Sequence, residues 1–347
     1  MLLRIFILIP FFLLNFITAK SQQTSKDSIA QLLKAVNPGN EKVLLYLQLG
    51  QTFQSSNNDS AHLYYEKARA LANHMDAKKG LTKYISGQLN LLNQKSEFEE
   101  GLVLAQKDIS IGQELKDPKI LIVAYNDAAN EYEYLSDYQP AAQYYLKSLK
   151  LATAMGNEEM QSKVNNNLAS VFINLKDYPT AYGYSSRAFK IANKLHDTVT
   201  MGNCLLNNGV SEIHQKKYKE ALFDFEQSEK AGYRIPDMSL VTDAMSDEGL
   251  IYYTLHNLES AEKIFRRELM ISEKNHLDYE KMYALFGLAV VAKDRNNFET
   301  AEQYTSDAIG IGENLNTAEE LMEMYDTMSV IKQVMKKPDE ALLYKNK

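Results

Sequence analysis

Small residues return at a fixed interval of forty positions along most of the chain. Residues 137–152 read DYQPAAQYYLKSLKLA and residues 177–192 read DYPTAYGYSSRAFKIA, so the two segments share their small and aromatic positions. A large apolar or aromatic residue usually stands three positions earlier, as Tyr138 stands before Ala141. The small column consists of Ala61, Gly101, Ala141, Ala181, Ala221, Ala261, Ala301 and Ala341. Such a column indicates an internal structural repeat.

Within one period the apolar positions have the spacing of an α-helix. Tyr138, Ala141, Tyr145, Ser148 and Ala152 step by three or four residues, so they share one helix face. In the next period a helical stretch over 164–175 precedes the equivalent segment, and a polar joint at 176–177 separates the two. Each period therefore predicts a helix, a tight turn and a second helix. Because one such pair cannot bury its apolar face, we expect stacked pairs to share a continuous core.

This pattern resembles the tetratricopeptide repeat (TPR) family, whose motif places a small and an aromatic residue in a first helix (helix A) and Ala, an aromatic residue and Ala in a second (helix B). The matching residues are Ala129, Tyr132, Ala141, Tyr145 and Ser148 in the third repeat, and Ala169, Phe172, Ala181, Tyr184 and Ala188 in the fourth. The resemblance covers residues 42–347, about seven repeats plus a truncated eighth. It is strong in repeats three, four and six and weak in repeat two, where Asp108 occupies the small position.

The resemblance implies an all-α fold, a right-handed superhelical solenoid of antiparallel helix pairs. Two features depart from the family motif. The period is 40 residues rather than 34, which implies longer helices like those of larger bacterial sensory arrays, and no repeat carries the helix-A Trp because the chain has none.

Residues 1–21 have the pattern of a secretory signal peptide. Arg4 precedes an apolar run over 5–17, and Ala19 and Ser21 form a small-x-small cleavage pattern. We therefore expect an exported protein, periplasmic or secreted, in which residues 22–41 form a leader before the repeats. An uncleaved membrane anchor is the alternative, since residues 2–19 are just long enough to span a bilayer.

Charge and cysteine content narrow the class of ligand. The formal net charge is −7, and basic residues run no further than pairs such as Lys216-Lys217, so nucleic-acid binding is not expected. The single cysteine, Cys204, excludes an intramolecular disulfide and a multi-cysteine metal site. Its apolar surroundings predict a buried small side chain rather than a reactive thiol.

The sequence contains no recognisable catalytic or cofactor motif. The six His residues do not form an H-E-x-x-H pair or another metal-ligand spacing, and there is no phosphate-binding loop. We therefore expect a protein that is not an enzyme and has no metal and no cofactor. An enzyme remains the third hypothesis, and it requires a cluster of buried carboxylates or His residues with strongly shifted pKa values.

The resemblance also implies that helix A of each repeat lines a concave groove, which in similar arrays often receives an extended peptide. Its inward positions fall on Asn126, Asn130, Asn166, Asn167, Asn207 and Asp247. Amide side chains carry both donors and acceptors, so a row of them can pair with the main chain of a protein or peptide segment. Solvated polar residues without a ligand are the alternative. A basic clamp for a terminal carboxylate is not evident, since only Lys163 occupies such a place.

The last repeat contains a short second helix over 338–347. A helix of this length is marginal without tertiary support.

A signal peptide followed by repeats resembles the exported sensory region of bacterial histidine kinases and helix-turn-helix regulators, which implies a membrane span and an output domain after residue 347. The leading hypothesis is a non-catalytic binding scaffold exported across the inner membrane, and the sensory half of a signal-transduction protein is the second.

Overall fold

The computed structural model describes residues 29–54, 57–74, 78–315 and 317–347. The predicted signal peptide over 1–21 lies outside these residues. Of the predicted leader, residues 29–35 are helical. No described helix is both long enough and apolar enough to cross a membrane.

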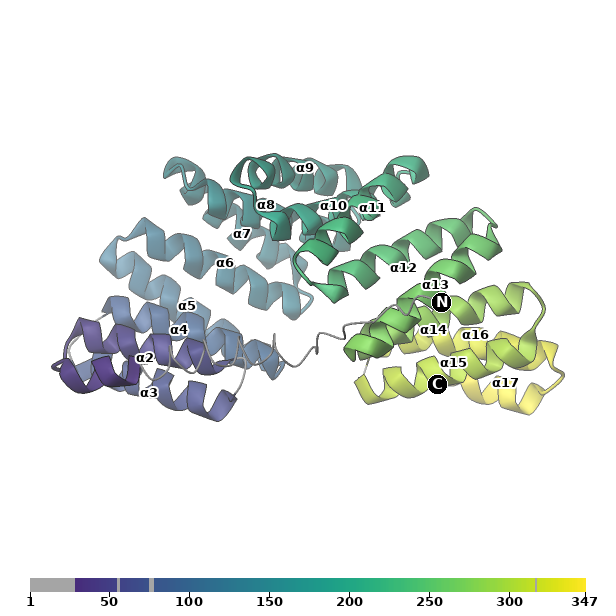
Figure 1. Cartoon of the computed structure of the whole chain (residues 1–347), viewed down its shortest axis with the longest axis horizontal. Coiled ribbons are helices and arrows are strands. Elements are labelled where there is room, and N and C mark those ends of the chain that lie inside the picture. The colour runs from purple at the N-terminus through teal and green to yellow at the C-terminus, as the bar shows by residue number, and fades with distance from the viewer. Residues whose placement is uncertain (1–28, 55–56, 75–77, 316) are drawn as a thin grey trace, which may run out of the picture. The chain divides into compact units, whose positions relative to one another are not determined.

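The described part of the chain is all helical, without strands, and consists of consecutive antiparallel pairs (Figure 1). The first helix of each pair is helix A and the second is helix B. Helices A are α2 (Asn40–Gln54), α4 (Lys78–Gln94), α6 (Pro118–Tyr134), α8 (Glu158–Asn174), α10 (Thr198–His214), α12 (Met238–Thr254), α14 (Asp278–Asp294) and α16 (Ala318–Val334). Helices B are α3 (Asn58–His74), α5 (Phe98–Leu115), α7 (Tyr138–Ala154), α9 (Tyr178–Leu195), α11 (Tyr218–Arg234), α13 (Leu258–Asn275), α15 (Phe298–Leu315) and α17 (Pro338–Lys345).

The described residues form two compact units, which divide between Leu151 and Ala152. Unit 1 contains α2 to α6 and most of α7, and unit 2 contains α8 to α17. The predicted all-α, TPR-like solenoid of helix pairs is confirmed.

A turn every twenty residues explains the forty-residue period. A residue with positive φ ends almost every helix: Ser96, Lys116, Ser136, Gly156, Lys176, His196, Lys216, His256, His276, Asn296 and Lys336. At the end of α9, for example, the N–H groups of His196 and Asp197 donate to the carbonyls of Asn193 and Ala192. Asp197 then caps α10, because its carboxylate accepts from the Thr200 N–H at 3.1 Å.

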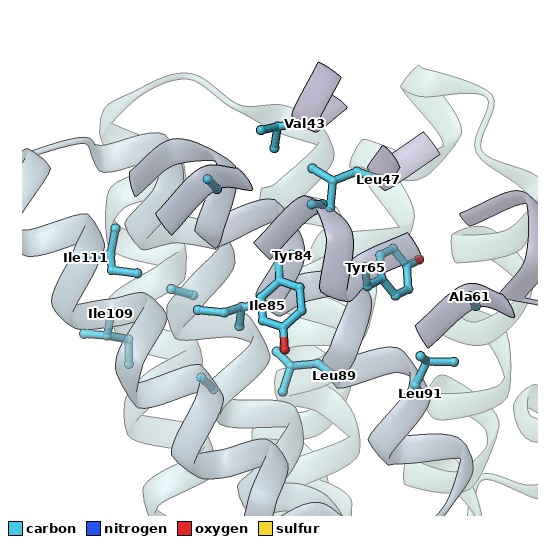
Figure 2. Close-up of a cluster of buried hydrophobic side chains, with 14 of the residues drawn as sticks. Val43, Leu47, Ala61, Tyr65, Tyr84, Ile85, Leu89, Leu91, Ile109 and Ile111 are labelled. Atoms are coloured by element: carbon cyan, nitrogen blue, oxygen red, sulfur yellow. The ribbon is translucent and has the colours of Figure 1, made fainter. Parts of the chain in front are cut away.

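Aromatic residues of helix B pack where helices A carry glycine. A Cβ atom added to Gly249 of α12 would lie 2.4 Å from the Phe265 ring, and one added to Gly287 of α14 would lie 2.6 Å from the same ring. In unit 1, Tyr65 occupies the equivalent place between Gly50 and Gly87. Figure 2 shows Tyr65 in the buried cluster of unit 1. The missing side chains let helices A approach the ring closely.

Helices A of successive pairs touch one another in unit 2, as α8 touches α10 and α10 touches α12. Among the described residues of that unit, the helices B α9, α11, α13 and α15 make no such contacts with one another. Helices A therefore form one continuous inner face. Cys204 lies beneath this face and is fully buried, as predicted.

Candidate functional site

A polar residue occupies the same repeat position in α6, α8, α10 and α12, whereas Leu47, Gly87 and Gly287 stand there in α2, α4 and α14. In unit 2 this column contains Asn167 of α8, Asn207 of α10 and Asp247 of α12, each half-buried. In unit 1 it contains Asp127 of α6, which was missing from the predicted site although it lies forty residues before Asn167. Burial raises the pKa of Asp127 to about 6.

The other predicted residues lie on neighbouring columns. Asn126 and Asn130 lie on α6 in unit 1, where the Tyr145 hydroxyl lies 2.6 Å from Asn130 Oδ1. In unit 2, Asn207 Nδ2 donates to Asn166 Oδ1 at 3.1 Å, so α8 and α10 are joined across the inner face. Lys163, the one candidate for a carboxylate clamp, pairs instead with Glu159 of its own helix at 2.7 Å.

A hollow of about 310 Å³ opens on this face of unit 2, and two of the predicted residues, Asn207 and Asp247, line it. Its walls come from α8, α10, α12, α13 and α14. One wall is apolar, formed by Ile173, Leu206 and Val210. The remaining lining residues are Ser170, Asp243, Ser246, Glu268, Tyr279, Glu280 and Tyr283.

Four carboxyl groups meet in this hollow without a basic partner among the described residues. Burial, together with the repulsion of neighbouring carboxylates, raises the pKa of Asp243 and of Asp247 to about 7. The same two causes hold the pKa of Glu268 well above its usual range, with Asp243, Asp247 and Glu280 as the neighbouring charges. The hollow therefore has a strongly acidic character.

Glu268 is the most buried of these acids. Its side chain is 0% exposed, and within the described structure no donor reaches either carboxylate oxygen in hydrogen-bond geometry. The Ser246 hydroxyl lies near enough to favour the ionised carboxylate and so opposes the rise in its pKa, although it does not meet hydrogen-bond geometry. A buried carboxyl group without a donor is costly, because it has lost its hydration and gained no hydrogen bond.

The position of Glu268 in the repeat shows why this acid is unusual. It belongs to a helix-B column that is otherwise mostly small: Ala68, Asp108, Ser148, Ala188, Ser228, Glu268 and Ala308. The serines of this column donate to helix A, as Ser228 Oγ does to the Gly202 carbonyl at 3.0 Å. The interpretation of repeat six as a strong match was therefore wrong at this position, and extending the forty-residue column to Glu268 would have found it.

Two tyrosines form the aromatic wall of the hollow. The rings of Tyr279 and Tyr283 on α14 lie edge to face with centroids 5.1 Å apart. The Tyr279 hydroxyl donates to Glu320 of α16 at 2.7 Å, and the Tyr283 hydroxyl lies 3.3 Å from the same oxygen. Burial, with hydrogen bonding to Glu320 as a smaller cause, raises the pKa of both phenols, so they are neutral at physiological pH.

The donor set does not favour a metal ion. Nowhere in the described part of the chain do three His, Cys, Asp or Glu side chains converge in a way that could hold one. The hollow instead combines carboxylates, aromatic rings and an apolar wall, which suits an organic ligand that carries hydrogen-bond donors.

No protein-family model and no curated protein matches the chain. Several solved structures do. Aspartyl phosphate phosphatase F from Bacillus subtilis is 15% identical with a TM-score of 0.65, and the match covers 93% of this chain and 86% of that one. A signal-transduction ATPase with a tetratricopeptide repeat sensor from Pyrococcus horikoshii has 16% identity and a TM-score of 0.65, covering 84% and 44%. NprR in complex with its cognate peptide NprX has 17% identity and a TM-score of 0.60, covering 82% and 83%. At these identities the likeness shows the fold alone, which is a TPR-like helical repeat.

Proposed function

We propose that the protein is a non-catalytic scaffold that binds an extended segment of a protein or peptide along the inner face of helices A. The observation that carries this proposal is the polar column of Asn167, Asn207 and Asp247, which runs over three consecutive helices A of unit 2 and reaches the acidic hollow at Asn207 and Asp247. The likeness to NprR, whose structure holds a cognate peptide, supports the same use of the fold.

The pair formed by Asn166 and Asn207 matches the chemistry of a peptide main chain. Asn207 donates to Asn166, which leaves the Asn166 amide as a donor and Asn207 Oδ1 as an acceptor without a partner in the described structure. A peptide unit in an extended segment presents one carbonyl and one N–H group. The pair can therefore hold a ligand by its backbone and read little of its side-chain sequence.

Selection from a random peptide library displayed on phage, with the purified protein immobilised, tests the proposal. We expect enriched peptides to lose binding when Asn166 and Asn207 are replaced together by Ala, with an unchanged circular dichroism spectrum. The matched control replaces Asn193 and Asn275, exposed residues of helices B, and should bind as the wild type does. Failure to enrich any peptide, or equal binding by both variants, would contradict the proposal.

Export is part of the proposal and rests on the signal-peptide pattern of residues 1–21. We further propose, as the alternative assignment, that the repeats are the sensory region of a signal-transduction protein. The likeness to an ATPase with a repeat sensor supports it, and this chain covers less than half of that protein. The intact mass of the protein made from its native locus tests both points. A loss of residues 1–21 supports export, and a mass far above 39.5 kDa supports the sensory assignment.

The carboxylates of the hollow favour a hydrolytic enzyme as a second candidate function, because their raised pKa values suit proton transfer near neutral pH. Incubation of the selected peptides with the protein, followed by mass spectrometry, separates the two functions. A scaffold leaves every peptide intact. Cleavage by the wild type that is lost in Glu268→Gln would establish catalysis instead.

A further inference from the structure

We propose that the acidic hollow of unit 2 receives an ammonium group of the bound segment, held by Glu268 at its base and by Asp243 and Asp247 of α12. This inference rests on the proposed function and adds the chemical class of the group that the inner face selects.

Glu268 supplies the first part of the argument. It is fully buried and lines the hollow, and no donor among the described residues, the nearby Ser246 hydroxyl included, meets either oxygen in hydrogen-bond geometry. An ammonium group brings three N–H donors and a positive charge, so it satisfies the oxygens and offsets the repulsion among the carboxylates. A neutral ligand group would leave that repulsion in place.

The rim of the hollow supports the same ligand. Asp243 and Asp247 of α12 and Glu280 of α14 face Glu268, and none of them forms an ion pair within the described structure. The rings of Tyr279 and Tyr283 add an aromatic surface, which attracts cations through the electron density of its faces. Four acids with no resident cation therefore surround a space that is large enough for one side chain.

The apolar wall distinguishes an organic cation from a metal ion. Ile173, Leu206 and Val210 line the side of the hollow on α8 and α10. A hydrated divalent ion gains nothing from such a wall, whereas an ammonium group on an alkyl stem buries its methylene groups there. The described residues also provide no metal-ligand cluster. A lysine side chain suits both parts of the hollow, since its methylene groups match the apolar wall and its ammonium group matches the carboxylates.

Binding of a cation should become tighter as pH rises. The titratable groups that face Glu268 are Asp243 and Asp247 on α12, Tyr279, Glu280 and Tyr283 on α14, and Glu320 beyond them on α16. The pKa values of Asp243 and Asp247 are raised to about 7, so both are partly protonated at neutral pH. A bound cation favours their ionised forms, so protons are released on binding.

Three synthetic pentapeptides test the proposal by NMR titration of the purified protein. They are acetylated Ala-Ala-Lys-Ala-Ala amide, its norleucine analogue, and the norleucine analogue with a free N-terminus. We expect at least one ammonium-bearing peptide to bind ~10-fold tighter than the neutral peptide, or about 1.4 kcal/mol. Preference for the first assigns the group to a lysine side chain, and preference for the third assigns it to a peptide N-terminus. Equal affinity of all three overturns the proposal.

Substitutions in the hollow test whether it causes the preference for ammonium-bearing peptides. Glu268→Gln and, separately, Asp247→Asn should abolish the preference, whereas Asp108→Asn should preserve it. Asp108 is the matched control because it occupies the column of Glu268 in α5 of unit 1. A preference that survives both substitutions in the hollow, or displacement of the lysine peptide by calcium chloride, overturns the assignment. Peptides that are selected on the inner face but show no preference for a cation would refute this inference alone.

Discussion

Two buried acids in the small column of helix B distinguish this chain from its own repeat pattern. Asp108 is 1% exposed, and its Oδ1 atom has no hydrogen-bond partner within the described residues. Burial and the charge of Asp127 raise the pKa of Asp108 to about 7. At the equivalent place in the next repeat, Ser148 Oγ donates to the Ile122 carbonyl at 2.7 Å. The repeat architecture therefore does not require an acid here.

Replacing Asp108 by Ser should stabilise the protein by about 2 kcal/mol near pH 8, because it removes a buried carboxylate whose Oδ1 atom has no donor. The gain should shrink near about pH 5.5, where the carboxyl group of the folded protein is protonated. Urea unfolding at both pH values measures the difference. A gain that is the same at both would show that ionisation of Asp108 does not carry the cost.

Little of the site chemistry could be predicted from residue types alone. The forty-residue column located Asn207 and Asp247 because the inner face repeats with the helix pairs. It did not predict that Asn166 and Asn207 bond to each other, since that depends on the offset between α8 and α10. Glu268 was missed because this helix-B position was expected to hold a small residue. Following the column in steps of forty residues along the sequence would have shown an acid there.

At the scale of the helix, some glycines of helices A pack directly against an aromatic ring of helix B. This contact determines which glycines can be replaced by alanine without loss of stability. Gly249→Ala should destabilise the protein by about 1–3 kcal/mol, because its new Cβ would lie 2.4 Å from the Phe265 ring. Gly183→Ala on α9 is the matched control. Nothing lies within 4 Å of its added Cβ, so it should stabilise by about 1 kcal/mol through helix propensity. Thermal denaturation of the two variants measures both effects, and changes of the same sign would refute the packing argument.

The helix caps give a second prediction at this scale. Asp197→Ala should lower the free energy of unfolding by about 1 kcal/mol, because α10 loses the acceptor for the Thr200 N–H. Asp278→Ala removes the same charge from the first turn of α14, where Leu277 is the cap residue and provides no side-chain hydrogen bond. Chemical denaturation should show only a few tenths of a kcal/mol for this control. An equal loss in both variants would assign the effect to charge rather than to capping.

Helix pairs were predictable from the sequence because three physical signals coincide at each turn. Small residues mark where two helices approach, apolar residues keep helical spacing, and polar or Asx residues start the next helix, as Asp177 does for α9. The residues with positive φ were harder to predict from the sequence. Lys176 and His196 adopt a conformation that sequence arguments normally assign to glycine. Their place follows from the twenty-residue turn rather than from residue type.

At the scale of the whole molecule, carboxyl groups with raised pKa values set the response to pH. The pKa values of Asp108, Glu131, Asp243 and Asp247 are raised to about 7. Their unfolded values lie near 4, so between these limits the folded protein holds more protons than the unfolded chain. The stability that these groups contribute is fully present below about pH 4 and is lost as pH rises through about 7. His214, whose pKa is lowered by burial, acts in the opposite sense as a single group.

We therefore expect the melting temperature to fall as pH is raised from about 5.5 to 8. The melting temperature should also fall as pH is lowered below about 4. The ion-paired carboxylates Asp117 and Glu262 have lowered pKa values, and their protonation removes the attraction to their basic partners. Differential scanning calorimetry across this range measures the profile. A melting temperature that rises between about pH 5.5 and 8 would contradict the raised pKa values of these acids.

The ligand is proposed to lie on the inner face of helices A. The most direct measurement is photo-crosslinking with a selected peptide that carries a benzophenone at its central residue, followed by mass spectrometry of the adducts. We predict adducts on α8, α10, α12 and α14, with Tyr279 and Tyr283 beside the hollow among the labelled positions. Adducts confined to the helices B α9, α11 and α13 would contradict the inner-face assignment.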